Sequence, residues 1–454
     1  MPKINLNDTI AALSTPPGEG GMAVIRVSGK EAIALCENFF KSPQNGKLSR
    51  AATHTIHHGR FVDEKGQMID EVLMNLFHSP HSYTGEEVVE INCHGGMRVT
   101  KRILEILTRS GARHAEPGEF TKRAFLHGKM DLTQAEAVLD LIRSRSDLGL
   151  ETALQQLQGG LSKKIILLKD SLMKIYAHFE ASLDFPDEHL EVDSKEKFLK
   201  RIEETDKEIS SLIASFRRGQ AMREGVLTVI VGRPNVGKSS LINTLLQKDR
   251  ALVSEIPGTT RDSLEEMIEI GRMAVRLVDT AGLGASGDRL DRLGMERTKR
   301  CLDEGSLFLF LADGSSPWTS EDQAILDQLE GKNYLFVVNK IDLPQKLDRG
   351  KQDPCLISCL NQKGIEALLK RIEKKIEVMN FQESTTLTRL RHKQAFEKSL
   401  ESLRKAKQAL KENLSTEFIL EDLKKSVESL QELVGEIYSE DLLDVIFQEF
   451  CIGK

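Results

Sequence analysis

Apolar residues in the second half of the chain come in short runs, separated by stretches of helical spacing. The runs at 226–231, 275–278 and 334–338 are rich in β-branched residues, which is typical of strands buried on both faces. Residues 240–246, which follow the first run after a loop, repeat apolar positions at helical spacing. Strands that alternate with helices form a doubly wound parallel sheet. We therefore predict an α/β domain over residues 220–382.

The remaining residues follow two other patterns. Residues 1–119 mix strand-like runs with two helical segments, which predicts a small α+β domain. Residues 120–219 and 383–454 have helical spacing almost throughout. The economical interpretation is one helical domain built from both segments, with the α/β domain inserted at an exposed loop. A pair of separate helical domains is the alternative. In the first segment, Thr133 and Glu136 fit a capping box at the start of a helix.

The loop after the first buried run has the pattern of a phosphate-binding loop. Residues 232–239 read Gly-Arg-Pro-Asn-Val-Gly-Lys-Ser, which is G-x-x-x-x-G-K-S between a strand and a helix. The glycines let the backbone wrap around an anion with its N–H groups pointing inward. Lys238 is expected to reach the β- and γ-phosphates of a nucleotide, and Ser239 to ligate Mg²⁺.

Two later segments supply groups expected around the γ-phosphate. The hydroxyl of Thr260 can close on Mg²⁺ and the γ-phosphate, with Thr259 as the alternative. Asp279 follows the buried run at 275–278 and can hold a Mg²⁺-bound water. Gly282 lets a backbone N–H approach the γ-phosphate, because glycine has no side chain in the way.

The segment Asn339-Lys-Ile-Asp342 indicates a guanine nucleotide. Asp342 can accept hydrogen bonds from the N1–H and the exocyclic amine of guanine, a donor pair that adenine lacks. Ser358 is expected to be the last contact to the base. In this order and spacing, the motifs predict a Ras-like P-loop GTPase domain. The expected contacts to GTP are Asn235, Val236, Gly237, Lys238, Ser239, Ser240, Ser254, Thr259, Thr260, Asp279, Thr280, Ala281, Gly282, Asn339, Lys340, Asp342, Ser358, Cys359 and Leu360.

Composition narrows the class of protein. The 454 residues suffice for two or three domains, and an apolar content of 40% supports real cores. A net charge of −6 gives no global electrostatic footprint for nucleic acid, although contact with RNA can still be local. Six cysteines without paired zinc spacing indicate a reduced, cytoplasmic protein. The sequence has no signal-peptide pattern and no apolar stretch of about 18 residues, so no membrane span is expected.

Short strings outside the GTPase motifs are specific to one family. They are Thr15-Pro-Pro-Gly18, Tyr83-Thr-Gly-Glu-Glu87, His94-Gly-Gly96, the segment 117–126 and the terminal Cys451-Ile-Gly-Lys454. With these strings, the whole chain resembles the MnmE (TrmE) family of tRNA uridine-modification GTPases. The resemblance implies a multidomain α/β fold. Its parts would be an N-terminal α+β domain (1–119), an all-helical domain in two halves (120–219 and 383–454) and an inserted Ras-like GTPase domain (220–382).

The resemblance also implies an activity. Members hydrolyse GTP and, with an FAD-dependent partner called MnmG (GidA), modify C5 of the wobble uridine of certain tRNAs. The added aminomethyl or carboxymethylaminomethyl group takes a carbon from 5-formyl- or methylene-tetrahydrofolate. Members form a homodimer through the N-terminal domain and join the partner in a heterotetramer or larger complex.

The family's folate pocket maps onto both ends of this chain. Arg26, Glu90, Lys129 and Lys454 are expected to contact the folate, since cationic side chains suit its carboxylates and a carboxylate suits pterin N–H donors. The C-terminal segment should therefore pack on the N-terminal domain, of its own subunit or of the dimer partner. Cys451 is either a nucleophile in the modification or an inert residue at a helix end.

One departure from Ras-like proteins concerns hydrolysis. Leu283 stands where they carry a glutamine that positions water, and leucine cannot orient water. The resemblance implies that K⁺ near the phosphates and an acid further along compensate. Asp291 is expected to be that acid, although the family usually has Glu, and Asp288 is the alternative. The expected K⁺ ligands are Asn235, Ser254, Ile256 and Thr259, the Mg²⁺ ligands Ser239 and Thr260, and the catalytic residues Asp291, Lys238 and Cys451.

A ribosome-assembly GTPase of the Era or Der type, which uses GTP only to gate RNA docking, is the alternative function. Such factors carry a compact basic RNA module or a second GTPase domain, and the sequence has the pattern of neither. A non-enzymatic helical scaffold conflicts with the intact set of nucleotide motifs.

Overall fold

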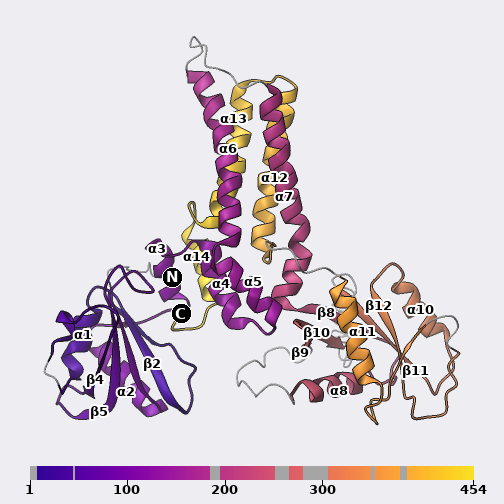
Figure 1. Ribbon diagram of the computed structural model, residues 1–454, viewed down its shortest axis with the longest axis horizontal. Coiled ribbons are helices and arrows are strands. Elements are labelled where there is room, and N and C mark those ends of the chain that lie inside the picture. The colour runs from indigo at the N-terminus through magenta and orange to yellow at the C-terminus, as the bar shows by residue number, and fades with distance from the viewer. Residues whose placement is uncertain are drawn as a thin grey trace, which may run out of the picture. The chain divides into compact units, whose positions relative to one another are not determined.

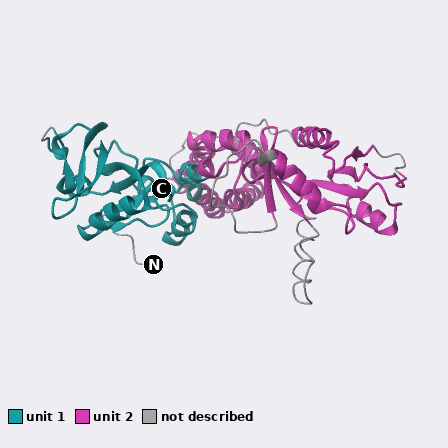
Figure 2. Cartoon of the chain, turned by 90° about the horizontal axis from the view of Figure 1, so that it is seen from below, with its two compact units in different colours: residues 1–139, 431–454 teal, residues 140–430 magenta. Residues whose placement is uncertain are grey.

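The chain folds into two compact units. The computed structural model describes residues 8–43, 46–184, 195–250, 265–279, 305–348, 353–378 and 386–454. Unit 1 comprises Met1–Leu139 and Gln431–Lys454, and unit 2 comprises Asp140–Leu430 (Figure 2). None of the described helices combines the length and the hydropathy needed to cross a bilayer. The four-part domain division drawn from the sequence stays a prediction.

A seven-stranded sheet forms the centre of unit 1, in the order β3-β4-β5-β6-β2-β1-β7. Its main strands alternate buried and exposed side chains; in β5, Val72, Met74 and Leu76 are buried while Glu71 and Leu73 are exposed. This alternation is what a sheet with one covered face requires. The strands are β1 (Ile10–Leu13), β2 (Gly20–Ser28), β3 (Phe40–Lys41), β4 (Thr55–Val62), β5 (Met68–Phe77), β6 (Val88–Gly95) and β7 (Arg113–His114).

Helices α1 (Ala32–Phe39) and α2 (Met97–Arg109) pack on the buried face of this sheet. The opposite face leaves Ile56 68% exposed on β4, beside Leu73 on β5. The 3₁₀ turn η1 spans Leu48–Arg50, and two helices, α3 (Glu119–Leu126) and α4 (Leu132–Arg143), follow β7. The predicted α+β domain is confirmed.

The predicted capping box at Thr133 is wrong. Helix α4 already begins at Leu132, so Thr133 lies inside it. Asp131 caps the helix instead, because its carboxylate accepts the backbone N–H of Gln134 at 3.0 Å and the hydroxyl of Thr133 at 2.7 Å.

The C-terminal segment completes unit 1. Helix α14 (Glu440–Gln448) packs on α3, where Lys122 Nζ donates to Asp444 Oδ1 at 2.7 Å. Gly118, just before α3, has φ 70°, and a Cβ there would lie 2.6 Å from the carbonyl oxygen of Phe447. A side chain at this position would therefore prevent the close approach of α14.

Five helices of unit 2 come from two separate stretches of sequence. They are α5 (Asp147–Leu157), α6 (Gly160–Asp184), α7 (Lys195–Glu224), α12 (Leu390–Lys411) and α13 (Thr416–Val434). Helices α7 and α12 run side by side (Figure 1), and Arg404 of α12 donates to Asp206 of α7 at 2.9 and 3.0 Å. Helix α7 continues through Gly225 directly into the first strand of the second sheet.

The second sheet has six strands in the order β13-β12-β11-β8-β10-β9. All neighbouring pairs are parallel except β9 and β10. The strands are β8 (Val226–Val231), β9 (Glu265–Ile270), β10 (Met273–Asp279), β11 (Leu307–Asp313), β12 (Tyr334–Asn339) and β13 (Cys355–Leu356). The helices among them are α8 (Lys238–Arg250), α10 (Ser320–Gln328) and α11 (Ile365–Glu377). The predicted multidomain α/β class is confirmed, and the carboxyl ends of β8, β10 and β12 carry the nucleotide motifs.

Candidate functional site: a guanine-nucleotide cavity and a charged cluster in unit 1

The phosphate loop at 232–237 is locked to the segment expected to bind the base. Asn235 and Gly237 have φ of 63° and 102°, which fit a loop that wraps around an anion. A Cβ on Gly237 would lie 2.4 Å from Asn339 Nδ2, so only glycine fits there. The same amide of Asn339 donates to the carbonyl oxygen of Val236 at 3.0 Å. Loop and base segment therefore form one rigid site.

Two residues expected close to Mg²⁺, Ser239 and Asp279, contact each other. Ser239 Oγ donates to Asp279 Oδ2 at 2.7 Å, which brings together two oxygen donors of the kind Mg²⁺ prefers. Lys238 Nζ donates to the carbonyl oxygens of Gly232 and Arg233 at 2.7 and 2.9 Å. Burial lowers the pKa of Lys238, and the nearby Asp279 carboxylate opposes that shift.

At the base end, Ser358 Oγ donates to Asp342 Oδ1 at 2.5 Å and orients this carboxylate. The backbone N–H of Cys359 donates to Asn339 Oδ1 at 3.1 Å. Lys340 Nζ donates to Asp313 Oδ2 at 2.6 Å and to the carbonyl oxygen of Asn235 at 2.9 Å. The loop and the base segment line a cavity of about 1010 Å³, together with Ser240 and Leu360.

Sequence reasoning missed Asp313, which fixes Lys340. The available signal was its position at the end of another buried run, β11. Most of the residues expected around the γ-phosphate and in hydrolysis lie outside the described residues, namely Ser254, Ile256, Thr259, Thr260, Thr280, Ala281, Gly282, Leu283, Asp288 and Asp291. Their roles stay predictions.

In unit 1, Arg26 of β2 and Glu90 of β6 face each other in register. Arg26 Nε and Nη2 donate to Glu90 Oε1 at 3.0 and 2.8 Å. The guanidinium carbon of Arg26 lies 5.2 Å from the ring centroid of Tyr83 and 5.6 Å from that of Phe120. This arrangement offers a flat ligand aromatic surfaces beside one cation and one carboxylate.

The C-terminal residues lie beside this arrangement. The backbone N–H of Phe120 donates to the carbonyl oxygen of Lys454 at 3.2 Å, and Ser14 Oγ donates to that of Gly453 at 3.2 Å. Burial and the Arg26 charge lower the pKa of Lys454, whereas Glu90 opposes the shift. The expected packing of the C-terminus on the N-terminal part is confirmed, within one chain.

Two other candidate residues are placed differently. Cys451 is exposed, and its carbonyl oxygen accepts the N–H of Gly118 at 3.4 Å. Lys129 Nζ donates to the carbonyl oxygen of Pro80 at 2.9 Å, and no described contact joins it to Arg26 or Glu90. Sequence reasoning assigned no role to Tyr83 or Phe120, although both lie in the family-specific strings.

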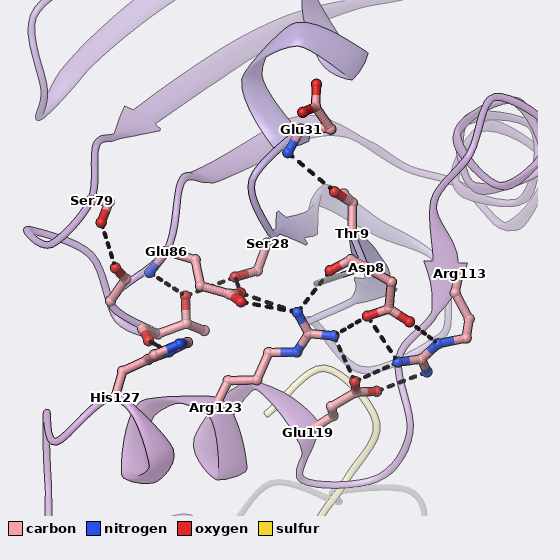
Figure 3. A network of polar contacts seen from close by, with 12 residues as sticks. Asp8, Thr9, Ser28, Glu31, Ser79, Glu86, Arg113, Glu119, Arg123 and His127 are labelled. Carbon is pink, nitrogen blue, oxygen red and sulfur yellow. Dashed lines mark hydrogen bonds and ion pairs between the residues drawn. The ribbon is translucent and has the colours of Figure 1, made fainter. Parts of the chain in front are cut away.

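A buried ion network holds the helix that carries Phe120. Arg123 of α3 has a fully buried side chain and donates to Glu119 at 2.9 Å, to Glu86 at 3.1 Å and to Asp8 at 2.5 Å (Figure 3). Arg113 joins the same group through Asp8 and Glu119 at 2.8 and 2.6 Å. Asp8 and Glu119 thus each pair with both guanidinium groups, so the network ties α3 to β7 and to the segment before β1.

Arg123→Met is expected to destabilise unit 1 by roughly 3–5 kcal/mol, because it leaves the buried Glu86 without its guanidinium partner and Glu119 with Arg113 alone. The measurement is the opening free energy from hydrogen exchange of the α3 amides. Arg98→Met on the exposed surface of α2 is the matched control, expected within about 0.5 kcal/mol of wild type. Equal effects of the two substitutions would contradict the role of the network.

The same network makes unit 1 sensitive to acid. Burial acts to raise the pKa values of Asp8 and Glu119, but hydrogen bonds from Arg113 and Arg123 outweigh it and hold both below the ordinary 3.8 and 4.5. Because the folded values are depressed, the stabilisation is complete above the ordinary pKa values and is lost as the pH falls through the folded ones. We expect the protection of α3 amides to be constant near neutral pH and to decline below about pH 4.5. Protection that is unchanged at pH 3 would contradict this linkage.

Comparison with known proteins identifies the family. A family model described as MnmE helical domain matches residues 132–451, and one described as GTP-binding protein TrmE N-terminus matches residues 9–129. The tRNA modification GTPase MnmE of Alkaliphilus metalliredigens is 43% identical, over 99% of this chain and 100% of that protein. MnmE of Natranaerobius thermophilus is 44% identical, over 98% and 99%. A solved structure of Aquifex aeolicus Era with GDP and aluminium fluoride is 26% identical, covers 38% of this chain and 65% of that chain, and has a TM-score of 0.25. On the family models and full-length relatives, this chain belongs to the MnmE family of tRNA modification GTPases.

Proposed function

We propose that the protein hydrolyses GTP and, together with an FAD-dependent partner, modifies C5 of the wobble uridine in certain tRNAs. The proposal rests on the presence of two candidate binding sites in one chain. One is the nucleotide cavity with Asp342 held by Ser358 at 2.5 Å. The other is the charged cluster of Arg26, Glu90 and Lys454.

Guanine is the base that suits Asp342. Its N1–H and exocyclic amine are two donors on one edge, and a carboxylate is an acceptor with two oxygens. Mg²⁺ would be held by Ser239, with Asp279 beside it, and by Thr260. Lys238 would turn from the carbonyl oxygens of its own loop to the β- and γ-phosphates.

The chemistry of the charged cluster in unit 1 suits a reduced folate. Such a group would supply a one-carbon unit at the oxidation level of formyl or methylene. Glu90 would accept from N–H donors of the pterin, Tyr83 and Phe120 would contact its ring, and Arg26 and Lys454 would hold carboxylates. Lys129 belongs to this set only if it leaves Pro80. We propose Cys451, which is exposed, as the nucleophile of the modification.

A homodimer through unit 1 agrees with the uncovered face of its sheet. Ile56 and Leu73 are exposed there, 68% and 37%, and offer apolar contact area to a partner. We propose a second copy of this chain as its partner, with the flavoprotein joining to form a heterotetramer or larger assembly in the cytoplasm.

Hydrolysis is expected to depend on K⁺. With Leu283 unable to position water, K⁺ held by Asn235, Ser254, Ile256 and Thr259 would neutralise charge that develops in the transition state, and Asp291 would orient the water. We expect turnover of GTP in KCl to exceed that in NaCl at matched ionic strength by at least about tenfold.

Asn235→Gly tests the K⁺ ligand without backbone strain, since φ at this position is 63°. For this variant, the rates of GTP turnover in KCl and in NaCl should differ much less than they do for the native chain. Equal rates of GTP turnover by the native chain in KCl and NaCl would contradict the proposed role of K⁺.

The function as a whole is tested by mass spectrometry of wobble nucleosides in tRNA from cells that lack this chain. Loss of the modified uridines, restored by the native gene, is the expected result. Normal nucleosides in such cells would contradict the proposal.

A further inference from the structure

A second cleft in unit 2 lies at the edge of the GTPase sheet away from the nucleotide. It has a volume of about 780 Å³ and is lined by Leu227 at the start of β8 and by Ser306 just before β11. The nucleotide motifs follow the carboxyl ends of these parallel strands, so the two cavities occupy opposite edges of the sheet. Phe216 of α7 and Leu390 of α12 form the facing wall.

The charged residues that line this cleft are mostly basic. Arg217 and Arg218 of α7, Arg276 of β10 and Lys393 of α12 contribute four cations, against one lining carboxylate, Glu224. Glu224 is already engaged by Gln220 at 3.0 Å and by Arg223. We call the cleft that these four cations line the basic cleft.

Three of the cations are only partly neutralised by their surroundings. Arg217 is exposed and takes part in no ion pair within the described parts of the chain. Arg276 lies 3.5 Å from Glu265, and its buried Nε makes no hydrogen bond to any described residue. Lys393 Nζ lies 5.4 Å from the ring centroid of Phe216 and 3.4 Å from Glu397. Such a concentration favours an anionic ligand with several charges.

We propose that the basic cleft binds the phosphodiester backbone of the tRNA substrate. The inference rests on the proposed function, which supplies the RNA. Because the chain carries a net charge of −6, RNA cannot be held by a global field and requires a local basic patch. One guanidinium group can donate two parallel hydrogen bonds to two oxygens of a phosphate. The three arginines and one lysine of the cleft come from one strand and two helices and line the same space.

RNA in this cleft would contact the strands that end at the nucleotide. Arg276 and Asp279 lie on the same strand, β10, and Leu227, which lines the cleft, belongs to β8, which leads into the phosphate loop. A shift of either strand would reach both cavities. Any effect of bound GTP on tRNA affinity would then be matched by an equal effect of tRNA on GTP affinity.

The test compares two double variants of the full chain that remove equal charge. Arg217→Ala with Lys393→Ala alters the cleft, and Lys200→Ala with Lys207→Ala removes exposed lysines elsewhere on α7. Affinity for unmodified tRNA is measured between 50 and 200 mM KCl, with thermal unfolding of each variant as the check on folding. The cleft variant should bind on the order of tenfold more weakly, with a salt slope shallower by about 1.5–2, and the control should match wild type.

Three outcomes would overturn the proposal. The first is equal affinity of the cleft variant and wild type, and the second is equal weakening by both variants. The third is loss of modification with unchanged tRNA affinity, since the cleft would then receive an acidic protein surface. In each case wild-type binding of tRNA leaves the proposed function standing. That function fails separately if wild type does not bind tRNA and cells lacking the chain keep normal wobble nucleosides.

Discussion

Asp342→Asn is expected to weaken GTP binding by roughly 100- to 1000-fold and to shift preference toward xanthosine triphosphate. The carboxylate can accept two hydrogen bonds from guanine, and a charge-assisted bond contributes about 1.5–3 kcal/mol. The amide turns an N–H donor toward the donors of guanine, whereas xanthine offers a carbonyl oxygen at that position. Affinities of the native chain and the variant for GTP, ATP and the xanthosine nucleotide measure the effect.

Asp353→Asn provides the matched control. Asp353 is a carboxylate of the same domain that pairs with Arg371 at 2.9 Å. Its loss should leave the preference for GTP intact. Equal binding of ATP and GTP by the native chain would refute the assignment of Asp342 to the base.

Deletion of Cys451–Lys454 is expected to abolish tRNA modification and leave GTP hydrolysis in place. The deleted residues supply the carbonyl oxygens that bind Phe120 and Ser14, as well as the Lys454 cation. Gly453 sits at φ 96°, where a Cβ would lie 2.4 Å from the carbonyl oxygen of Leu13, so the tail follows one path. The nucleotide cavity belongs to unit 2 and keeps all its described lining residues.

A milder variant separates the site from folding. Lys454→Met retains the backbone contacts and should weaken binding of a reduced folate about 10- to 100-fold, the value of one charge-assisted contact. Ile452→Ala, at a side chain that is 59% exposed, should bind folate as wild type does. A truncated protein that still modifies tRNA normally would contradict the role of the tail, and simultaneous loss of GTP hydrolysis would make it a folding element.

The nucleotide site was predictable because its parts are short strings tied to strand ends. The run 226–231 predicts strand β8 of the sheet. The strings after it contain Asn339 and Asp342, which hydrogen-bond to Val236 and Ser358 in the structure. The proximity of Arg26 and Lys454 was predictable only through the family resemblance, because no local sequence pattern indicates a contact between residues so far apart in the chain.

Other features depend on long-range packing and left no local signal. Arg123 is a buried arginine whose partners Asp8 and Glu86 come from distant segments that precede β1 and β6, and in sequence it has the pattern of an ordinary helical surface cation. Strand β1 is only four residues long and too short to show alternation. Thr133 and Glu136 had the spacing of a capping box, but Asp131, directly before α4, provides the cap.

The division of unit 1 between residues 8–139 and 431–454 has a consequence for biosynthesis. Roughly 290 residues, the whole of unit 2, are translated between its two parts, which takes about 15–60 s at bacterial-type elongation rates. During that interval the surface of Phe125 and Gly118 that Tyr438 and Phe447 later cover stays open to water and to chaperones. Ribosome-bound chains halted before residue 431 should therefore be more readily bound by chaperones at this surface than chains that have passed it.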